Sequence, residues 1–172
     1  MRQRSHRKFL APGARLLALV TALAVVGVAD LRADFDAGRR SYAIGDYDAA
    51  FKEWLPLAEA GDPRAQNNIG YLYRKGFGVP LDEVAAAEWY RRAAEQGHVA
   101  AMANLGYMYD EGRGVVRDYV QSYNWFLLAV QNGDEEAVEH LKILEEDFMT
   151  LEQVAEAKRL AAKWRPKAPG GE

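Results

Sequence analysis

Apolar residues in the middle of the chain recur every three or four positions, which is the spacing of amphipathic α-helices rather than of strands. The pattern predicts one helix over residues 83–96 and a second over 99–111. Gly97 follows the first helix, as is common at a helix C-terminus. Asp82 and Asp118 lie where helices are predicted to begin, because a carboxylate there accepts hydrogen bonds from free backbone N–H groups.

A repeat of 36 residues underlies these helices, because the sequence matches itself when it is shifted by that length. The matched positions hold small, aromatic or aliphatic residues: Gly61, Gly97 and Gly133; Ala65, Ala101 and Ala137; Trp54, Tyr90 and Phe126; Ile69, Leu105 and Leu141. Each unit is predicted to be a helix pair that buries one side against the next unit. Gly70 and Gly106 recur inside a helix, which predicts close helix packing, and Trp89 and Trp125 are expected to occupy equivalent buried positions.

The end of the chain is expected to close this array. Thr150 and Gln153 have the spacing of a capping box at a helix N-terminus. From Leu151 an apolar stripe continues to Trp164, so residues 150–164 are predicted to form a capping helix over the last repeat. Residues 165–172 are interpreted as a disordered tail.

Two stretches of the chain carry a resemblance to a known family. They are AQNNIGYLYRKGFGVPLDEVAAAEWYRRAAEQG and AMANLGYMYDEGRGVVRDYVQSYNWFLLAVQNG. Both resemble the Sel-one-like repeat (SLR) family of the tetratricopeptide-like (TPR-like) superfamily, whose pattern is A-x-x-x-L-G-x-x-Y-x-x-G-x-G-V-x-x-D-x-x-x-A-x-x-W-Y-x-x-A-A-x-x-G. The first departs from it at Ile69, and the second at Ser122, Phe126 and 128–130.

Upstream, residues 38–50 resemble an ordinary tetratricopeptide unit with a shorter loop. The resemblance therefore implies an all-α fold, an α/α superhelix (solenoid) of about eight helices. Residues 34–149 would hold one TPR-like unit and two Sel-one-like repeats, followed by the capping helix.

The same resemblance implies a protein-binding scaffold or envelope regulator with a concave groove lined by the first helix of each pair. The expected groove residues are Asn67, Tyr71, Arg74, Asn104, Tyr107 and Asp110. Tyr71 and Tyr107 share a register, and two interpretations stand equal for them: binding anchors, or packing between helices. The ligand would be a protein or peptide, or else an envelope glycan.

Residues 1–29 differ from the rest of the chain in composition. They hold five basic residues, no acidic residue and an apolar run over 16–29. That run is shorter than the roughly 20 residues that span a bilayer, so the segment is interpreted as a secretory signal peptide rather than a membrane anchor. Cleavage is expected after Ala29, or after Ala33 with a less suitable residue at −3. The mature protein would be periplasmic or secreted.

Composition and motif spacing limit the chemistry. The sequence has no cysteine, which excludes disulfides and thiolate metal sites. Beyond residue 29 acidic residues outnumber basic ones, which argues against nucleic-acid binding. His98 and His140 lack metal-ligand spacing, and no nucleophile motif is present, so neither cofactor, metal site nor catalytic residue is predicted. The alternatives are a secreted enzyme of β-lactamase type and a structural subunit of an envelope assembly.

Overall fold

The computed structural model describes residues 35–168. The predicted signal peptide, with both of its expected cleavage sites, lies outside the described residues, as do residues 169–172 of the predicted tail. The described part contains helices and no strand, which confirms the all-α prediction. None of its helices has the length and apolar character needed to cross a membrane.

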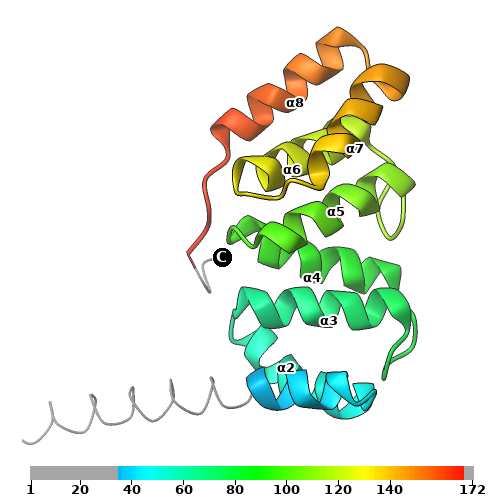
Figure 1. The fold of residues 1–172 in the computed structure, drawn as a ribbon, viewed down its shortest axis with the longest axis vertical. Coiled ribbons are helices and arrows are strands. Elements are labelled where there is room, and N and C mark those ends of the chain that lie inside the picture. The colour runs from blue at the N-terminus through cyan, green and yellow to red at the C-terminus, as the bar shows by residue number, and fades with distance from the viewer. Residues whose placement is uncertain (1–34, 169–172) are drawn as a thin grey trace, which may run out of the picture. The chain divides into compact units, whose positions relative to one another are not determined.

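Residues 35–43 are helical and lead into the numbered elements. These are α2 (Tyr47–Glu59), α3 (Pro63–Lys75), α4 (Glu83–Glu95), α5 (Val99–Glu111), α6 (Tyr119–Gln131), α7 (Ala137–Ile143), the π-helical segment η1 (Leu144–Phe148) and α8 (Leu151–Lys163). Figure 1 shows them stacked in chain order from α2 to α8. The structure thus has the predicted solenoid of helix pairs.

The helix boundaries arise from the capping residues that the sequence predicted. The carboxylate of Asp82 accepts a hydrogen bond from the backbone N–H of Ala85 (2.9 Å), and Asp118 does the same for Gln121 (3.0 Å). At the C-terminus of α3, Gly76 has a φ of 68°, a left-handed conformation that glycine adopts without strain. The capping box at the start of α8 is also present.

Glycines inside helices mark the close approach within each pair. A Cβ atom at Gly70 would lie 2.9 Å from the ring of Tyr90, and one at Gly106 would lie 3.0 Å from the ring of Phe126. Gly38 stands in the same relation to the ring of Trp54. One packing arrangement therefore recurs in all three units, including the first.

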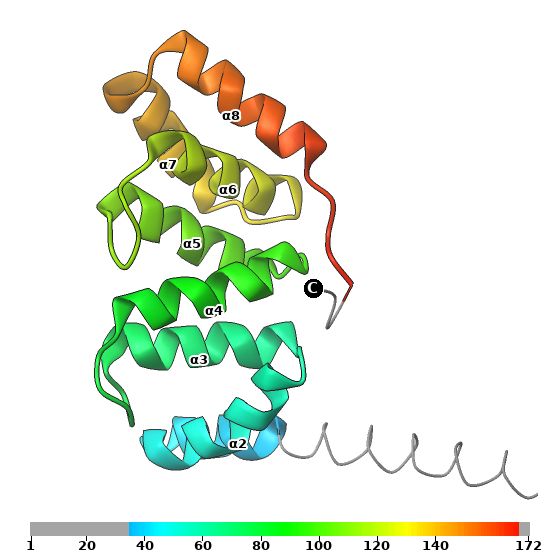
Figure 2. The ribbon, with the colours of Figure 1, turned by 180° about the vertical axis from the view of Figure 1, so that it is seen from behind.

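The loops between paired helices connect each unit to the one before it. A side chain at Gly78, between α3 and α4, would overlap the backbone of Tyr47 at the start of α2. Gly114, between α5 and α6, stands in the same position against Glu83 at the start of α4. Figure 2 shows both loops on one side of the stack, each reaching toward the preceding unit.

Two tryptophans that share a register differ in burial. Trp125 is 8 % exposed and belongs to the core of the second half of the array. Trp89 is partly buried against the core of the first half of the array, and the guanidinium of Arg92 lies 4.8 Å from its ring centroid. Both tryptophans therefore pack against a core as predicted, but Trp89 is more exposed than Trp125.

The C-terminal helix packs on α6 and buries Val154, Ala157 and Ala161. Leu151, predicted to belong to the apolar stripe, is 86 % exposed. It lies in the first turn of α8, on the side that faces solvent.

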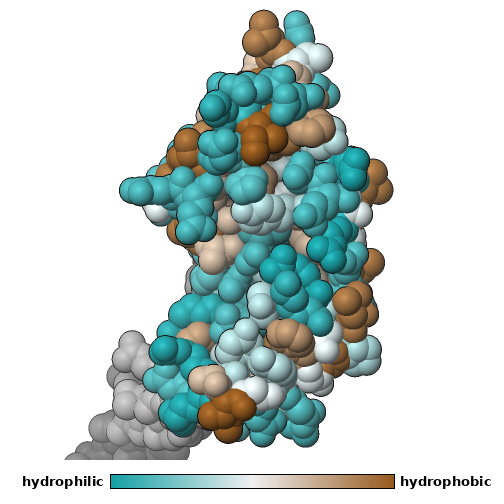
Figure 3. All heavy atoms as spheres, turned by 45° about the vertical axis from the view of Figure 1, so that its right-hand side comes forward, coloured by the Kyte–Doolittle hydropathy of each residue, from teal (hydrophilic) through white to brown (hydrophobic). Residues whose placement is uncertain are grey.

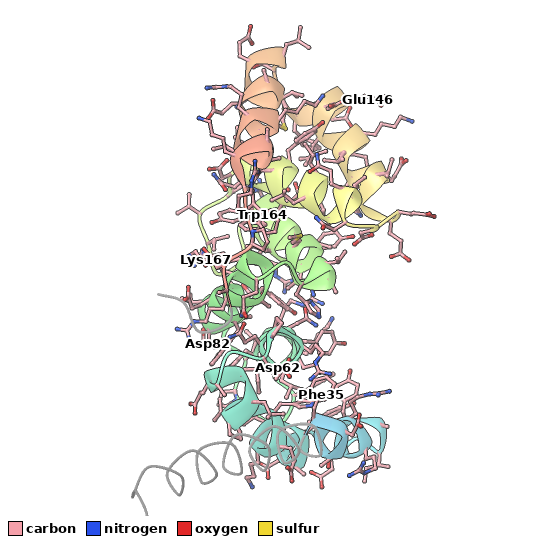
Figure 4. The ribbon with its side chains drawn as sticks, turned by 90° about the vertical axis from the view of Figure 1, so that its left-hand side faces the viewer. Phe35, Asp62, Asp82, Glu146, Trp164 and Lys167 are labelled. Atoms are coloured by element: carbon pink, nitrogen blue, oxygen red, sulfur yellow. The ribbon has the colours of Figure 1, made fainter. Side chains whose placement is uncertain are left out.

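The prediction of a disordered tail was wrong for residues 165–168. The backbone N–H of Lys167 donates to the carbonyl of Glu95 at 2.8 Å, and its Nζ atom lies 2.8 Å from the Glu95 carboxylate. Trp164 and Pro166 lie against Gly97, where a Cβ atom would stand in ordinary contact with both at 3.8 Å. Figures 1 and 4 show this segment running from α8 back along the stack toward α4.

Candidate functional site: the A-helix face

The first helices of successive units form one continuous row, which we call the A-helix face: residues 35–43, α3, α5 and α7. Neighbouring members are joined by an edge-on ring contact of Tyr42 and Tyr71 (6.2 Å), a hydrogen bond from Asn104 Nδ2 to Asn67 Oδ1 (3.1 Å) and a hydrogen bond between Tyr107 Oη and His140 Nε2 (2.7 Å). The predicted residues of the site therefore lie on one surface.

A pocket of about 600 Å³ opens at the start of this face. It is lined by Phe35, Arg39, Tyr42, Ala43, Trp54, Asn67, Asn68 and Tyr71. Four of these are aromatic, two are amides and one is a cation. An apolar lining with a few polar groups is the usual composition of ligand pockets, and the volume is within their ordinary range of roughly 300–1,000 Å³.

Internal contacts hold the walls of the pocket in place. The indole N–H of Trp54 donates to the carbonyl of Phe35 at 3.0 Å, which fixes the first helix on α2. Partial burial and the neighbouring Tyr71 hydroxyl raise the pKa of Tyr42 to about 12. Like an unperturbed tyrosine, Tyr42 is neutral at physiological pH and can donate a hydrogen bond.

Positive charge gathers beside Tyr71. The guanidinium carbon of Arg74 lies 5.5 Å from the Tyr71 ring centroid, and Lys75 Nζ lies 5.9 Å from it. The Nε atom of Arg74 is buried without a hydrogen-bond partner among residues 35–168. Arg74 also acts on the neighbouring Tyr90. Burial raises the pKa of Tyr90 to about 12, although the charge of Arg74 acts in the opposite direction.

The equivalent position one unit later is closed. Tyr107 packs edge-on against Phe126, with 4.9 Å between ring centroids, and its hydroxyl is bound to His140. The His140 ring in turn stacks on Phe126 at 5.0 Å. Tyr107 therefore joins α5 to α7, and its hydroxyl is occupied by this internal contact.

Negative charge surrounds this closed position. Burial, followed by the carboxylates of Asp134 and Glu136, raises the pKa of Tyr107. Asp110 lies one turn further along α5 and is partly buried; burial and the neighbouring Glu111 raise its pKa, against the effect of His140. The two ends of the A-helix face thus carry charges of opposite sign.

The structure divides the six predicted site residues into two groups. Asn67 and Tyr71 line the pocket, Arg74 borders it, and Asn104 is bound to Asn67. Tyr107 and Asp110 belong to the closed position. Of the two interpretations left open for the tyrosines, packing describes Tyr107, whereas Tyr71 is available at a pocket.

Sequence reasoning did not find Phe35, Arg39, Tyr42 and Trp54 as lining residues. A signal existed at Gly38, which packs on Trp54 as Gly70 packs on Tyr90. Aligning Gly38 with Gly70 would have placed Arg39 at the register of Tyr71. The shorter loop of the first unit concealed this correspondence.

The two histidines of the described part have separate roles. His98 begins α5, and its Nδ1 atom accepts a hydrogen bond from the backbone N–H of Ala101 (3.2 Å). His140 is bound to Tyr107. Within residues 35–168 no group of three potential metal ligands comes together.

Comparison with known proteins identifies the family. The Sel1 repeat family model matches residues 63–98 and 99–134. A solved Sel1 repeat protein from Oxalobacter formigenes is 34 % identical, with a TM-score of 0.61 over 74 % of this chain and 98 % of that one. The chain belongs to the Sel1 repeat family. Sel1 repeat proteins are generally protein–protein interaction scaffolds, and their fold is typically non-catalytic.

A longer member of the Sel1 repeat family is also similar. It is described as a protective antigen present in uropathogenic Escherichia coli strains displaying an SLR fold, and it is 32 % identical with a TM-score of 0.75. The match covers 87 % of this chain and 33 % of that one, so the chain spans a third of that relative's length. No curated protein matches the chain.

Proposed function

We propose that this Sel1 repeat protein is an exported scaffold or envelope regulator that binds a protein or peptide partner on its A-helix face, at the pocket beside Tyr71. One observation carries the proposal. At the same register in consecutive units, Tyr107 is bound to His140 of the following unit, whereas Tyr71 lines a pocket of about 600 Å³ on the side of the preceding unit.

The composition of the pocket favours a polypeptide. Tyrosine offers a large rigid surface at low entropic cost and carries a hydroxyl. The amides of Asn67 and Asn68 can both donate to and accept from a peptide backbone. A glycan ligand is the other possible outcome of the test below.

The test begins with capture of partners from a periplasmic extract and continues with titration of each purified candidate. Tyr71→Ala should weaken binding by about 2 kcal/mol or more, as truncation of an interface anchor does. Arg92→Ala is the control, because Arg92 lies on α4, outside the A-helix face. Circular dichroism must first show that both variants fold. Equal affinity of Tyr71→Ala and wild type would contradict the proposed site.

Export is part of the proposal and rests on the basic start and apolar run of residues 1–29. N-terminal sequencing of the protein from the periplasm or culture medium should begin at residue 30 or 34. An intact Met1 in the membrane fraction would contradict export.

We further infer that the protein binds without catalysis. Hydrolysis of nitrocefin should stay at the rate of buffer alone. A rate that rises in proportion to protein concentration would instead support the β-lactamase alternative.

A further inference from the structure

Arg74 and Asp110 occupy the same register in consecutive units but have opposite charges. Each lies one helical turn after a tyrosine of the A-helix face. Within residues 35–168 neither side chain has an ion-pair partner within 4.0 Å. Both are partly buried, so solvent screens them less than it screens a fully exposed charge.

The pocket end of the face is the cationic one. Arg39 lines the pocket, and Arg74 and Lys75 lie beside Tyr71. Arg39 pairs with Asp36 at 3.4 Å, but these side chains are 67 % and 61 % exposed, and such a pair contributes little in water. The lining of the pocket includes no carboxylate.

The other end of the face is anionic. Asp110 is accompanied there by Asp134 and Glu136, which act on the Tyr107 hydroxyl. The Asp134 carboxylate is used in the turn before α7, where it accepts hydrogen bonds from the backbone N–H groups of Glu136 and Ala137. Asp110 and Glu136 remain without an ion pair in the described part.

The two charges lie on helices that adjoin each other. Asn104 of α5 donates directly to Asn67 of α3, so no other element separates these helices at that point. An extended chain rises about 3.3 Å per residue. A short extended peptide lying across the face can therefore contact α3 and α5 in turn.

From these observations we infer that the A-helix face binds an extended peptide of opposite polarity, with an acidic side chain beside Arg74 and a basic side chain a few residues away beside Asp110. This inference rests on the proposed peptide-binding function. An apolar or aromatic residue next to the acidic one enters the pocket between Tyr42 and Tyr71. The amides of Asn67 and Asn104 lie about two turns earlier on α3 and α5 and offer further hydrogen-bonding groups to the peptide on the same face.

The experiment is a selection from a library of random twelve-residue peptides displayed on phage, with the purified protein as bait. Wild type should enrich peptides that carry Asp or Glu beside an aromatic residue and Lys or Arg at one fixed spacing a few residues away. An enriched peptide is then synthesised with an amidated C-terminus for titration, so that only a side-chain carboxylate can account for the acidic contact.

Two charge variants test the polarity directly. Arg74→Glu should lower the affinity for the synthetic peptide by about tenfold or more, as expected for loss of a hydrogen bond to a charged group. The double variant Arg74→Glu/Asp110→Arg should enrich peptides with the two charges exchanged. Lys163→Glu, an exposed charge reversal on α8, is the matched control and should bind as wild type does.

The outcomes separate this inference from the proposed function. In one outcome, binding of the enriched peptides depends on Tyr71 and yet is unaffected by the charges at positions 74 and 110. That result would overturn the proposed polarity but not the proposed peptide site. Failure to enrich any peptide, with binding of a polysaccharide instead, would overturn both. Loss of affinity on amidation alone would assign the acidic contact to a C-terminal carboxylate and overturn the side-chain assignment.

Discussion

The repeats at residues 63–98 and 99–134 share a backbone but differ in the residues that complete it. Gly70 and Gly106 admit an aromatic ring at the same point of each pair, and both second helices begin at an aspartate. Yet Tyr71 lines a pocket beside the preceding unit, whereas Tyr107 is bound to His140 of the following unit. The residues that form each helix pair are alike, whereas the residues that join neighbouring units along the A-helix face differ.

This comparison separates two demands on a repeat. Each unit must bury its side against its neighbours, and this fixes glycine, alanine and aromatic positions. Residues that do not take part in stacking can differ, as Arg74 and Asp110 do. Substitutions at matched positions of the two repeats therefore test whether a given residue stabilises the stacking of units or is free to contact a partner.

The largest difference is expected between the two tryptophans. Trp125→Ala should lower the free energy of unfolding by about 3–5 kcal/mol, because a buried aromatic side chain is lost. Trp89→Ala should cost less, because Trp89 is partly exposed and loses less buried apolar surface. Urea denaturation of both variants measures the difference. Equal losses would show that the two registers are energetically equivalent after all.

The paired tyrosines should differ by less. Tyr107→Phe removes the hydrogen bond to His140 and should cost about 1 kcal/mol, whereas Tyr71→Phe should stay within about 0.5 kcal/mol of wild type. Thermal unfolding of both variants gives the comparison. A double-mutant cycle with His140→Ala provides the control, since the loss from Tyr107→Phe should disappear in that background.

The helix caps of the two repeats should respond to acid in different pH ranges. Burial lowers the pKa of His98 below its usual 6.5, so the unfolded chain takes up the proton first. The stability that this cap provides, about 1 kcal/mol for a typical cap, is complete above pH 6.5 and is lost as the pH falls below it. Protonation turns Nδ1 from an acceptor into a donor.

The equivalent cap of the first repeat is Asp62, whose burial is outweighed by hydrogen bonds from Arg64 and Ala65 that lower its pKa below 3.8. Its contribution is present above pH 3.8 and is lost only as the pH falls through that lowered pKa. His98→Asp should therefore remove the loss of stability between pH 6.5 and 5. An unchanged pH profile in this variant would assign the loss to another group.

The smallest effect on stability is expected when Tyr90 is replaced by phenylalanine, the residue at the matching position 126 of the next unit. The Tyr90 hydroxyl is buried without a hydrogen-bond partner in the described part, so Tyr90→Phe should leave stability within about 0.5 kcal/mol of wild type. The melting temperature measures this, with Tyr107→Phe as the matched control. A loss of more than about 1 kcal/mol would show that Arg74 hydrogen-bonds to this hydroxyl.

Much of this fold was predictable because it depends on local residues. Asp82, Gly97 and Thr150 mark the ends of helices through backbone hydrogen bonds within a few residues, and these are visible in the sequence. The groove residues were predicted as a set from the family resemblance, which places the first helix of each pair on the concave face. The closure of Tyr107 was not predictable, because it depends on where α7 places His140, a residue 33 positions away.

The opening at the first unit was hidden for a similar reason. Its shorter loop breaks the 36-residue spacing, so that Arg39 and Tyr42 do not align with the later repeats. The contact of Lys167 with Glu95 joins residues 72 positions apart and has no local signal at all. Contacts between distant units, rather than contacts within a unit, limit what the sequence reveals here.

That contact of Lys167 changes how the described array should be regarded as a physical system. A solenoid behaves approximately as a one-dimensional lattice in which each unit is coupled only to its nearest neighbours, and such a lattice frays from its ends. The segment from Trp164 to Lys167 adds a coupling beyond the nearest neighbour, from α8 to the turn after α4. Detaching the last helix therefore breaks contacts in the middle of the lattice as well as at its end.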